Sequence, residues 1–319
     1  MARVVIVGAG LCGLTAGRAL AAAGHDVVLL DKGRSPGGRC ATRRIGGATF
    51  DHGAQFFTVR SDAFAGLVHA WQQSGVVEQW CLGFAGRVDG YPRYRVRHGM
   101  NALAKHLSLG LDVRCSTLAF TLRRSGTGWA VVDDTAREHH GDAVVLTTPV
   151  PQAFSFLIAA ELEVPAGVRA IDYARTLALL VVLEGAPSVP EPGGVQDGDD
   201  TFSFVSDNAR KGVSAIPALT LHVRAEPSKE WWDVEPGELE ALLRGAAATW
   251  IGSARVIDSQ VKRWRYATPT TIWPESHLVV HAEPPVVLAG DAFGGPKIEG
   301  AVRSGQAAAA ELLELLPRV

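Results

Sequence analysis

Short apolar runs, each followed by a glycine-rich stretch, open the chain. Residues 4–7 are four consecutive apolar residues, a pattern typical of a strand buried in the middle of a parallel sheet. Three glycines follow, and then a segment rich in Leu and Ala, for which we predict a helix from about residue 12 to residue 23. The next run, "DVVLLD" at residues 26–31, predicts a second strand. The start of the chain is therefore expected to form a βαβ unit.

The same pattern returns near the C-terminus. Residues 286–289 are apolar and predict another buried strand, which is followed by "GDAFGG" and by a helix that we expect to begin near Gly300. Residues 112–134 predict a β meander. "AVVLTTPVP" predicts a strand that Pro149 and Pro151 end.

The chain between these elements has a different pattern. Residues 61–98 predict an amphipathic helix, with Ser61 as its N-cap, and a hairpin around Asp89-Gly90. Residues 152–261 predict two apolar strands, a helix and a long Pro/Gly/Asp surface loop at 185–200, with Trp231 and Trp232 packed at the surface. Because 319 residues is near the upper limit for one core, we expect two domains. The first comprises 1–60, 99–151 and 262–319, and the second 61–98 and 152–261.

Composition and charge exclude several classes of protein. The chain is 47% hydrophobic and 20% charged, which is ordinary for a globular protein, and its net charge is -2. That charge does not favour nucleic acid or an acidic membrane as a partner. The four cysteines form no CxxC pair, so we expect free buried thiols and no metal site. The chain starts with a predicted strand and has no apolar run long enough to span a bilayer, so we expect no leader and a cytoplasmic location.

The first chemical motif is a dinucleotide-binding turn. Gly8, Gly10 and Gly13 form GxGxxG between the predicted strand and helix, and Asp31 follows about 20 residues later. The first glycine allows the tight turn, the second lets the main chain approach a pyrophosphate, and the third lets helix and strand pack closely. The helix N-terminus attracts phosphate, and Asp31 can accept hydrogen bonds from a ribose. An acid at this position favours FAD or NAD over NADP.

Two further segments decide between these cofactors. "KGRSPGGRCATRR" brings glycines and arginines close behind Asp31, and it suits a phosphate-binding loop and a solvated basic loop equally well. Near the C-terminus, Asp291 is placed to bind a polyol such as ribityl. A helix N-terminus at Gly300 and Ala301 would stabilise a flavin that becomes anionic on reduction. An NAD dehydrogenase does not need this second element, so FAD is favoured.

"FDHGAQFFTVR", residues 50–60, is unusual for a buried strand. Asp51, His52 and Gln55 are polar where Val or Ile is expected, and Gly53 weakens a strand. Together with "GAGLCGLTAG", "GGRCATR", "VVLTTPVPQA" and "GDAF…EGAVRSGQAA", this segment makes the chain resemble the renalase-like branch of the flavin-containing amine oxidase superfamily, nearly from end to end.

The resemblance implies an α/β fold. It consists of a Rossmann-like FAD-binding domain of the glutathione-reductase type and a mixed-sheet substrate domain, with p-hydroxybenzoate-hydroxylase-like topology. In this scheme the first predicted domain binds FAD and the second binds substrate. The implied cofactor-binding residues are Gly8, Gly10, Leu11, Cys12, Gly13, Asp31, Lys32, Gly38, Arg39, Ala54, Gln55, Phe56, Leu118 (through its main chain, at adenine), Gly290, Asp291, Glu299, Gly300 and Ala301. The implied substrate-facing residues are Gln55, Phe57, Trp264 and Tyr266.

The chemistry implied is hydride transfer to flavin N5 from a dihydro-NAD(P) isomer, with O2 reoxidising the flavin and forming H2O2. The flavin does this chemistry, so no protein group is assigned as catalytic. An FAD amine oxidase or desaturase acting on a small amine or secondary metabolite is the alternative, and an inactive dinucleotide-fold binding protein is a third hypothesis. Asp31, Arg39 and Asp291 argue against the third, because a protein without flavin does not need all three.

Several residues keep two interpretations. For His52 we favour packing over a ligand contact or a covalent flavin link. Trp264 and Tyr266 share one face of a predicted strand, with Arg263 and Arg265 on the other, and suit a substrate face or a core contact equally well. Arg93, Arg95 and Arg97 form a stripe for which a solvated edge strand is favoured over a phosphate grip. Some amine oxidases use a lysine to hold a water near N5, and the candidates here are Lys262 and Lys297.

Overall fold

The computed structural model describes residues 1–85 and 88–316, and its contacts divide the chain into two compact units. Unit 1 comprises Met1–Gly38, Leu103–Tyr173 and Thr268–Val319, and unit 2 comprises Arg39–Ala102 and Ala174–Ala267. Both are discontinuous. Their bounds differ from the expected ones, because residues 39–60, 99–102 and 262–267 group with unit 2 and residues 152–173 with unit 1.

Unit 1 is built on a six-stranded sheet. Its strands, in spatial order, are β17 (Leu278–Ala282), β18 (Pro285–Leu288), β11 (Ala143–Leu146), β1 (Arg3–Val7), β2 (Asp26–Leu30) and β7 (Asp112–Arg114). Strand β17 runs antiparallel to β18, and the other neighbours are parallel. Every residue of β11 and β18 is buried, as are the last four of β1. The continuous apolar runs of the sequence are therefore the central strands of an α/β sheet.

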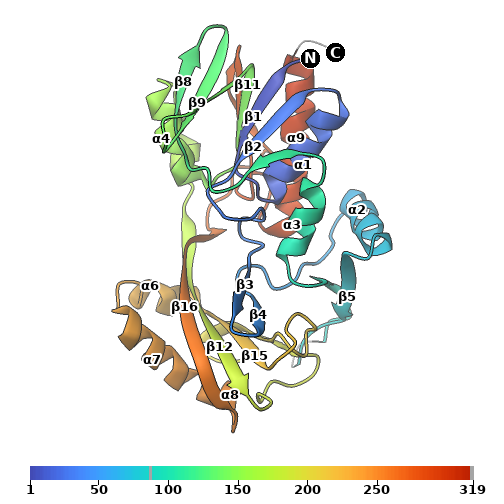
Figure 1. Ribbon diagram of the computed structural model, residues 1–319, viewed down its shortest axis with the longest axis vertical. Coiled ribbons are helices and arrows are strands. Elements are labelled where there is room, and N and C mark those ends of the chain that lie inside the picture. Colours follow the sequence, from blue (N-terminus) through green and yellow to red (C-terminus); the bar gives the residue numbers. More distant parts are fainter. Residues whose placement is uncertain (86–87, 317–319) are drawn as a thin grey trace. The chain divides into compact units, whose positions relative to one another are not determined.

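The helices of unit 1 pack through small residues. Figure 1 shows α1 (Leu11–Ala22) and α9 (Lys297–Leu315) side by side, and a Cβ added to Gly305 would overlap the carbonyl oxygen of Cys12. The two helices therefore touch main chain to main chain. Two shorter helices, α4 (Val150–Ala159) and α5 (Ala166–Arg169), follow β11. Pro149 is the N-cap of α4, so the prolines that were expected to end a strand begin a helix instead. Proline is tolerated there because the first N–H groups of a helix have no partner within the helix.

The predicted meander is shorter than expected. Strand β7 pairs in parallel with β2 in the main sheet, so it does not belong to the meander. The remaining strands form a three-stranded antiparallel sheet: β8 (Ala119–Ser125), β9 (Gly128–Asp133) and β10 (Glu138–Gly141). The meander pattern alone could not separate β7 from its neighbours, because its strand partner lies earlier in the chain.

Unit 2 is built on a five-stranded sheet. Its strands, in spatial order, are β13 (Gly194–Gln196), β14 (Phe202–Asp207), β15 (Ala218–Val223), β12 (Tyr173–Glu184) and β16 (Arg255–Pro269). Alternate residues of β12 serve two cores. Leu179 and Val181 pack on one face with the helices α7 (Pro236–Ala246) and α8 (Ala248–Ile251), which follow the short helix α6 (Ala225–Glu230), while Leu180 and Val182 pack on the other with a hairpin. Both faces of β12 are covered, which explains its unbroken apolar sequence.

Two hairpins and two helices complete the described part of unit 2. They are β3 (Thr42–Ile45) with β4 (Ala48–Asp51), β5 (Val77–Cys81) with β6 (Arg93–Val96), α2 (Asp62–Gln73) and the start of α3 (Asn101–Ser108). The Ser61 hydroxyl accepts a hydrogen bond from the Phe64 amide at 3.4 Å, which confirms the predicted N-cap. The second hairpin is also confirmed, but residues 82–92 connect its strands, so Asp89-Gly90 is not a two-residue turn; residues 86–87 of this connection lie outside the described part.

Two surface predictions in unit 2 are wrong. The segment 185–200 contains β13, and Val189 and Val195 lie in the core, so this segment is not a surface loop throughout. Trp232 is 8% exposed and belongs to the same core, with Trp231 packed against it. Within residues 1–85 and 88–316, no helix is both long and apolar enough to cross a membrane.

The contact between α1 and α9 generates a stability prediction. Gly305→Ala should lower the free energy of unfolding by about 1–3 kcal/mol, because the new methyl group forces the helices apart. Gly245→Ala in α7 is the matched control: a Cβ there meets nothing within 4 Å, and alanine should stabilise the helix by about 0.5–1 kcal/mol. Urea denaturation of the two variants measures both changes, and a stable Gly305→Ala protein would contradict the close packing.

Candidate functional site

The first turn of unit 1 leaves its main chain open at one point. Gly8 has φ 109°, and a Cβ there would lie 2.6 Å from the Thr147 hydroxyl. A Cβ on Gly13 would overlap the carbonyl oxygen of Gly8, so α1 lies directly against the end of β1. A Cβ on Gly10 would meet nothing within 4 Å. Protein atoms therefore fill the space beside Gly8 and Gly13, while the space beside Gly10 is open. Gly10 is the N-cap of α1, so this open space lies at the N-terminus of the helix.

Asp31 ties the end of β2 to this turn. Its carboxylate accepts hydrogen bonds from the Ala9 and Gly33 amides, each at 2.7 Å. A carboxylate has about four acceptor positions, so the half-buried side chain keeps capacity for ribose hydroxyls. The predicted glycine loop lies close by: the Gly37 amide donates to the Ala9 carbonyl at 2.9 Å, and a Cβ on Gly38 would lie 3.4 Å from the Cα of Gly10.

Other predicted residues of unit 1 are arranged around the same strands. The Asp31 carbonyl accepts a hydrogen bond from the Thr117 amide, which places Leu118 next to the strand end that holds Asp31. Lys32 is exposed, while Leu11 and Cys12 are buried in the first turn of α1. The Leu118 carbonyl accepts a hydrogen bond from the Asp134 amide, and its side chain is half exposed.

The C-terminal element begins earlier than predicted. Helix α9 starts at Lys297, with Pro296 as N-cap. Gly300 and Ala301 therefore lie within its first turns and not at its N-terminus, where they were expected. The first turn contains Glu299. Proline is suited to a helix start, which the sequence-based bound near Gly300 overlooked. A Cβ on Gly300 would overlap the Gly295 carbonyl oxygen, so the turn before α9 packs tightly on the helix.

The strand before this helix leads into a buried polar turn. Gly290, at φ 148°, donates its amide to the Ser304 hydroxyl at 2.8 Å, and Asp291 is 7% exposed. The Thr148 hydroxyl, one residue after the Thr147 that packs on Gly8, is buried and lacks a protein partner in the described ranges. The open main chain at Gly10, the spare acceptor positions of Asp31 and this unpartnered hydroxyl fit a bound dinucleotide such as FAD.

In unit 2, the polar segment after β4 packs on β16. A Cβ on Gly53 would overlap the Arg39 carbonyl oxygen, which also accepts a hydrogen bond from the Ala54 amide at 2.9 Å. The His52 and Trp264 rings stack with centroids 5.2 Å apart, and Trp264 Nε1 donates to the His52 carbonyl at 2.8 Å. Gly53 thus serves a main-chain contact, and Arg39 is held there, with its guanidinium on the Ala267 carbonyl at 3.2 Å.

One face of β16 gathers candidate substrate-facing groups. Lys262, Trp264 and Tyr266 alternate along the strand and are half-buried, while Arg263 and Arg265 are exposed. The predicted division of faces is confirmed, and Lys262 joins the aromatic face. Burial and the charge of Arg43 lower the pKa of Lys262. Lys297, the other lysine considered, is at the first position of α9 with φ 75°.

His52 and His222 are both held neutral. Burial, with a further contribution from the charge of Lys262, lowers the pKa of His52 to about 4. Burial also lowers the pKa of His222 to about 4. The His222 Nε2 lies 3.2 Å from the His52 carbonyl oxygen, which can only accept a hydrogen bond, so Nε2 carries the proton. The packing interpretation of His52 gains a partner in Trp264 that the sequence did not indicate.

The residues that follow His52 have separate environments. Gln55 is 5% exposed, and its Nε2 donates to the carbonyls of Asp51 and Gly53. Phe56 is half-buried and packs against Trp80, Phe84 and Phe204. Phe57 is 4% exposed within a cluster of Phe64, Trp71 and Tyr94, so its side chain has little surface for a ligand.

The arginine stripe of β6 is paired with acids. Arg93 is buried and binds Asp89 at 2.5 Å, while Arg95 and Arg97 bind Glu78 at 3.0 and 3.1 Å. A fully solvated stripe is therefore wrong for Arg93, and all three guanidinium groups already have anionic partners. This weakens the alternative of a phosphate grip.

The sequence did not identify Lys211. Its side chain is fully buried and its Nζ lies 2.8 Å from Asp51 Oδ2, also fully buried. The unusual acid in "FDHGAQFF" was a signal that a partner must exist, because a buried carboxylate requires one. Nothing in the polar stretch "SDNARKG" marks Lys211 as that partner.

Comparisons with known proteins agree on a flavin-dependent family. The model "Flavin containing amine oxidoreductase" matches residues 62–313, and an NAD(P)-binding Rossmann-like domain matches residues 6–72. Over 58 residues the chain is 50% identical to a hydroxyneurosporene desaturase of Rubrivivax gelatinosus, covering 18% of this chain and 11% of the relative. Over 64 residues it is 41% identical to a putative flavin-containing monoamine oxidase of Mycobacterium tuberculosis, covering 20% and 14%. The chain thus matches only a small part of these curated relatives' lengths.

Solved structures show the same fold over almost the whole chain. A cyclohexylamine oxidase from Brevibacterium oxydans aligns with a TM-score of 0.75 at 13% identity, covering 98% of this chain and 99% of that one. A putative protoporphyrinogen oxidase from Exiguobacterium sp. 255-15 aligns with a TM-score of 0.74 at 14% identity, covering 97% and 98%. The expected α/β Rossmann-like fold for FAD with a mixed sheet is confirmed.

The geometry of the first turn predicts that substitution of one glycine weakens FAD binding, whereas substitution of another lowers the stability of the protein. Gly10→Ala should leave the thermal unfolding of the cofactor-free protein nearly unchanged, because its methyl group meets no protein atom. It should weaken FAD binding on the order of tenfold, because the methyl group occupies the space the pyrophosphate needs. Gly13→Ala is the comparison, and should lower the unfolding temperature of the cofactor-free protein. Fluorescence titration with FAD and a thermal melt measure both; equal FAD affinity in Gly10→Ala would contradict the assignment.

The two neutral histidines predict a pH dependence. Their folded-state pKa values, about 4, lie below the ordinary value of 6.5. Between these values the unfolded chain takes up protons that the folded chain refuses, so stability should be complete above about pH 6.5 and fall as the pH drops toward about 4. His222→Gln should flatten this decline, measured as unfolding temperature against pH. The exposed His69→Gln is the control, and an equal flattening in it would refute the explanation.

Proposed function

The chain belongs to the flavin-containing amine oxidoreductase family, whose cofactor is FAD, and from that premise we propose that it is an oxidase of small amines. When bound, the flavin supplies the hydride acceptor. The substrate loses a hydride from the carbon next to nitrogen, and the nitrogen lone pair forms the C=N bond. Water then hydrolyses the resulting iminium ion to a carbonyl compound with release of ammonia or an amine, and O2 takes the two electrons and two protons to give H2O2.

The observation that carries this proposal is the neutral, aromatic face formed by His52 and Trp264. An amine can release a hydride in this way only when its nitrogen is neutral, because the lone pair must be free. The conditions that lower the pKa of His52 to about 4 are burial first and the charge of Lys262 second. The same conditions act on an amine bound beside this face and lower its pKa. The protein thereby holds the substrate in the reactive form.

The proposal assigns the two units different tasks. Unit 1 holds the adenosine and pyrophosphate through Asp31 and the Gly10 turn, with Leu118 near adenine and Asp291 at the ribityl chain. Unit 2 supplies the substrate-facing groups, of which Trp264 and Tyr266 are the strongest. Phe57 is the weakest candidate because it is buried in its own aromatic cluster.

A renalase-like oxidase of dihydronicotinamide isomers is the second candidate. The motifs "DHGAQFFT" and "GDAF" favour it, and so does the positive charge of Lys262 and Arg43 around His52, which suits a ligand with phosphates. This substrate needs no deprotonation, because losing a hydride leaves a stable aromatic cation. The two candidates therefore differ in pH dependence.

Anaerobic reduction of the bound FAD tests both. We expect putrescine or cyclohexylamine to bleach the flavin absorbance, with a rate that rises with pH and an apparent pKa below that of the free amine. Bleaching by a mixture of dihydro-NAD isomers alone, independent of pH, would replace the amine proposal with the second candidate. A flavin that stays oxidised with both ligand classes would reject both and leave an apolar, desaturase-type substrate.

A pair of variants on β16 tests the substrate face. Trp264→Leu should slow flavin reduction by about tenfold, because the substrate loses its stacking surface and its orientation. Arg265→Gln, on the opposite face of the same strand, should leave the rate unchanged. Equal rates in Trp264→Leu and the wild-type protein would show that this face does not bind the substrate.

A further inference from the structure

Lys211 is buried to a degree that is rare for a lysine. Its side chain and that of Asp51 are both fully buried, and their ion pair measures 2.8 Å. The ammonium also lies 5.3 Å from the centroid of the Trp80 ring. Removing two charges from water costs more than their attraction returns in many buried pairs, so apolar residues of similar size would often be equally stable. Stability alone therefore does not explain this pair.

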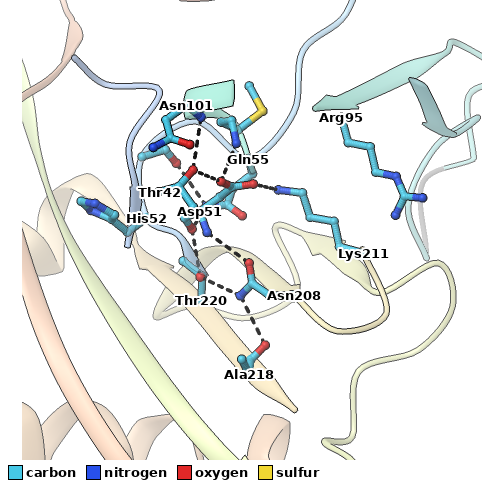
Figure 2. Close-up of polar contacts among 12 residues, drawn as sticks. Thr42, Asp51, His52, Gln55, Arg95, Asn101, Asn208, Lys211, Ala218 and Thr220 are labelled. Atoms are coloured by element: carbon cyan, nitrogen blue, oxygen red, sulfur yellow. Dashed lines mark hydrogen bonds and ion pairs between the residues drawn. The ribbon is translucent and has the colours of Figure 1, made fainter. Parts of the chain in front are cut away.

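Asp51 is the centre of a network that joins distant segments. Its Oδ1 accepts from the Thr42 hydroxyl and from the Met100 amide, each at 2.7 Å. Its Oδ2 accepts from Lys211. Figure 2 shows these bonds converging on the one carboxylate. The main-chain amide of Asn101 donates to the same Thr42 hydroxyl at 3.2 Å. The two carboxylate oxygens of Asp51 thus accept hydrogen bonds from three separate parts of unit 2.

The main chain of Asp51 is held as firmly as its side chain. Its amide donates to Asn208 Oδ1 at 3.3 Å, and its carbonyl accepts from the Thr220 hydroxyl at 2.9 Å. Asn208 Nδ2 in turn donates to that hydroxyl at 2.9 Å (Figure 2). Lys211 lies three residues after Asn208, so one turn supplies a bond to the side chain of Asp51 and a bond to its main chain.

This anchoring reaches the next residues through Gln55. Gln55 Nε2 donates to the Asp51 carbonyl at 2.6 Å and to the Gly53 carbonyl at 3.1 Å. Because both neighbours are acceptors only, the amide has one allowed orientation. Gln55 Oε1 is then a fixed acceptor, and it is buried without a protein partner in the described ranges. The position of Asp51 therefore determines what the segment 52–55 presents.

We propose that Lys211 is a positioning residue: by clamping Asp51, its ammonium fixes the segment His52 to Gln55 in the single arrangement that serves the flavin and substrate. The inference rests on the proposed function, in which this segment faces the ligands. Lys211 itself does no chemistry here. It is distinct from a lysine that holds water at the flavin, because its ammonium is enclosed in a fully buried ion pair.

Hydrogen–deuterium exchange of the FAD-loaded protein tests the clamp. In Lys211→Met, the Met100 and His52 amides should exchange at least about tenfold faster than in wild type, while the core strands β14 and β15 keep their protection. The visible spectrum of the bound flavin should shift, because the segment beside it has moved. Lys229→Met, an exposed lysine of α6, is the matched control and should change neither. Unchanged exchange at Met100 and His52 would overturn the proposal, and so would uniformly faster exchange throughout unit 2.

A double variant keeps the test decisive if Lys211→Met folds poorly. Asp51→Asn with Lys211→Met removes both charges, so no lone buried charge remains and the protein should fold. The amide oxygen that replaces the carboxylate can still accept from Thr42 and Met100, but the ionic clamp is gone, so exchange at Met100 and the flavin spectrum should remain altered. A double variant that matches wild type in both would show that the pair is dispensable and would overturn the proposal. Failure of wild type to oxidise amines would reject the proposed function and leave the exchange result standing.

Discussion

Main chain packed directly against main chain, with no room for a Cβ, is the constraint on which both units depend. In unit 1, α1 lies against the end of β1 at Gly13 and Gly8, and the turn before α9 lies against Gly300. In unit 2, Gly53 lies against the Arg39 carbonyl. Each contact fixes a helix start or a strand end more closely than side chains could, because main-chain atoms have no rotamers to relax. The binding groups are positioned by these contacts.

Asp51, the last residue of β4, and His52, which follows it, have opposite electrostatic environments. Both carboxylate oxygens of Asp51 accept hydrogen bonds, one of them from Lys211, while His52, the next residue, is stacked on Trp264 and stays neutral. Because successive residues of an extended segment point to opposite sides, Asp51 and the residue after it can hold a buried ion pair on one side and an uncharged ring on the other. The proposed amine-oxidising site would use both, since rigid positioning requires polar anchors and a reactive amine requires a site that disfavours charge.

Local features of the chain were predictable, and long-range side-chain pairs were not. The βαβ unit, Asp31 and the glycine turns follow from patterns within about 30 residues, because they depend on main-chain geometry that the local sequence determines. The face of β16 was predictable from alternation. The partner of Asp51 is 160 positions away, and nothing local to Lys211 distinguishes it from a surface lysine. Trp232 was misplaced for the same reason, because it is buried in a core formed with residues from strands earlier in the chain.

The same distinction bears on substrate choice. The chain shares its fold with a cyclohexylamine oxidase and a putative protoporphyrinogen oxidase at 13% and 14% identity, so the fold persists through almost complete change of side chains. A common fold therefore says little about what is oxidised. The informative residues are those whose environment the fold does not dictate: Lys262 on the aromatic face, the neutral pair of histidines, and the fixed acceptor of Gln55. The first two disfavour a cation beside them, and the third is a buried hydrogen-bond acceptor; both properties suit the proposed substrate, a neutral amine with an N–H group.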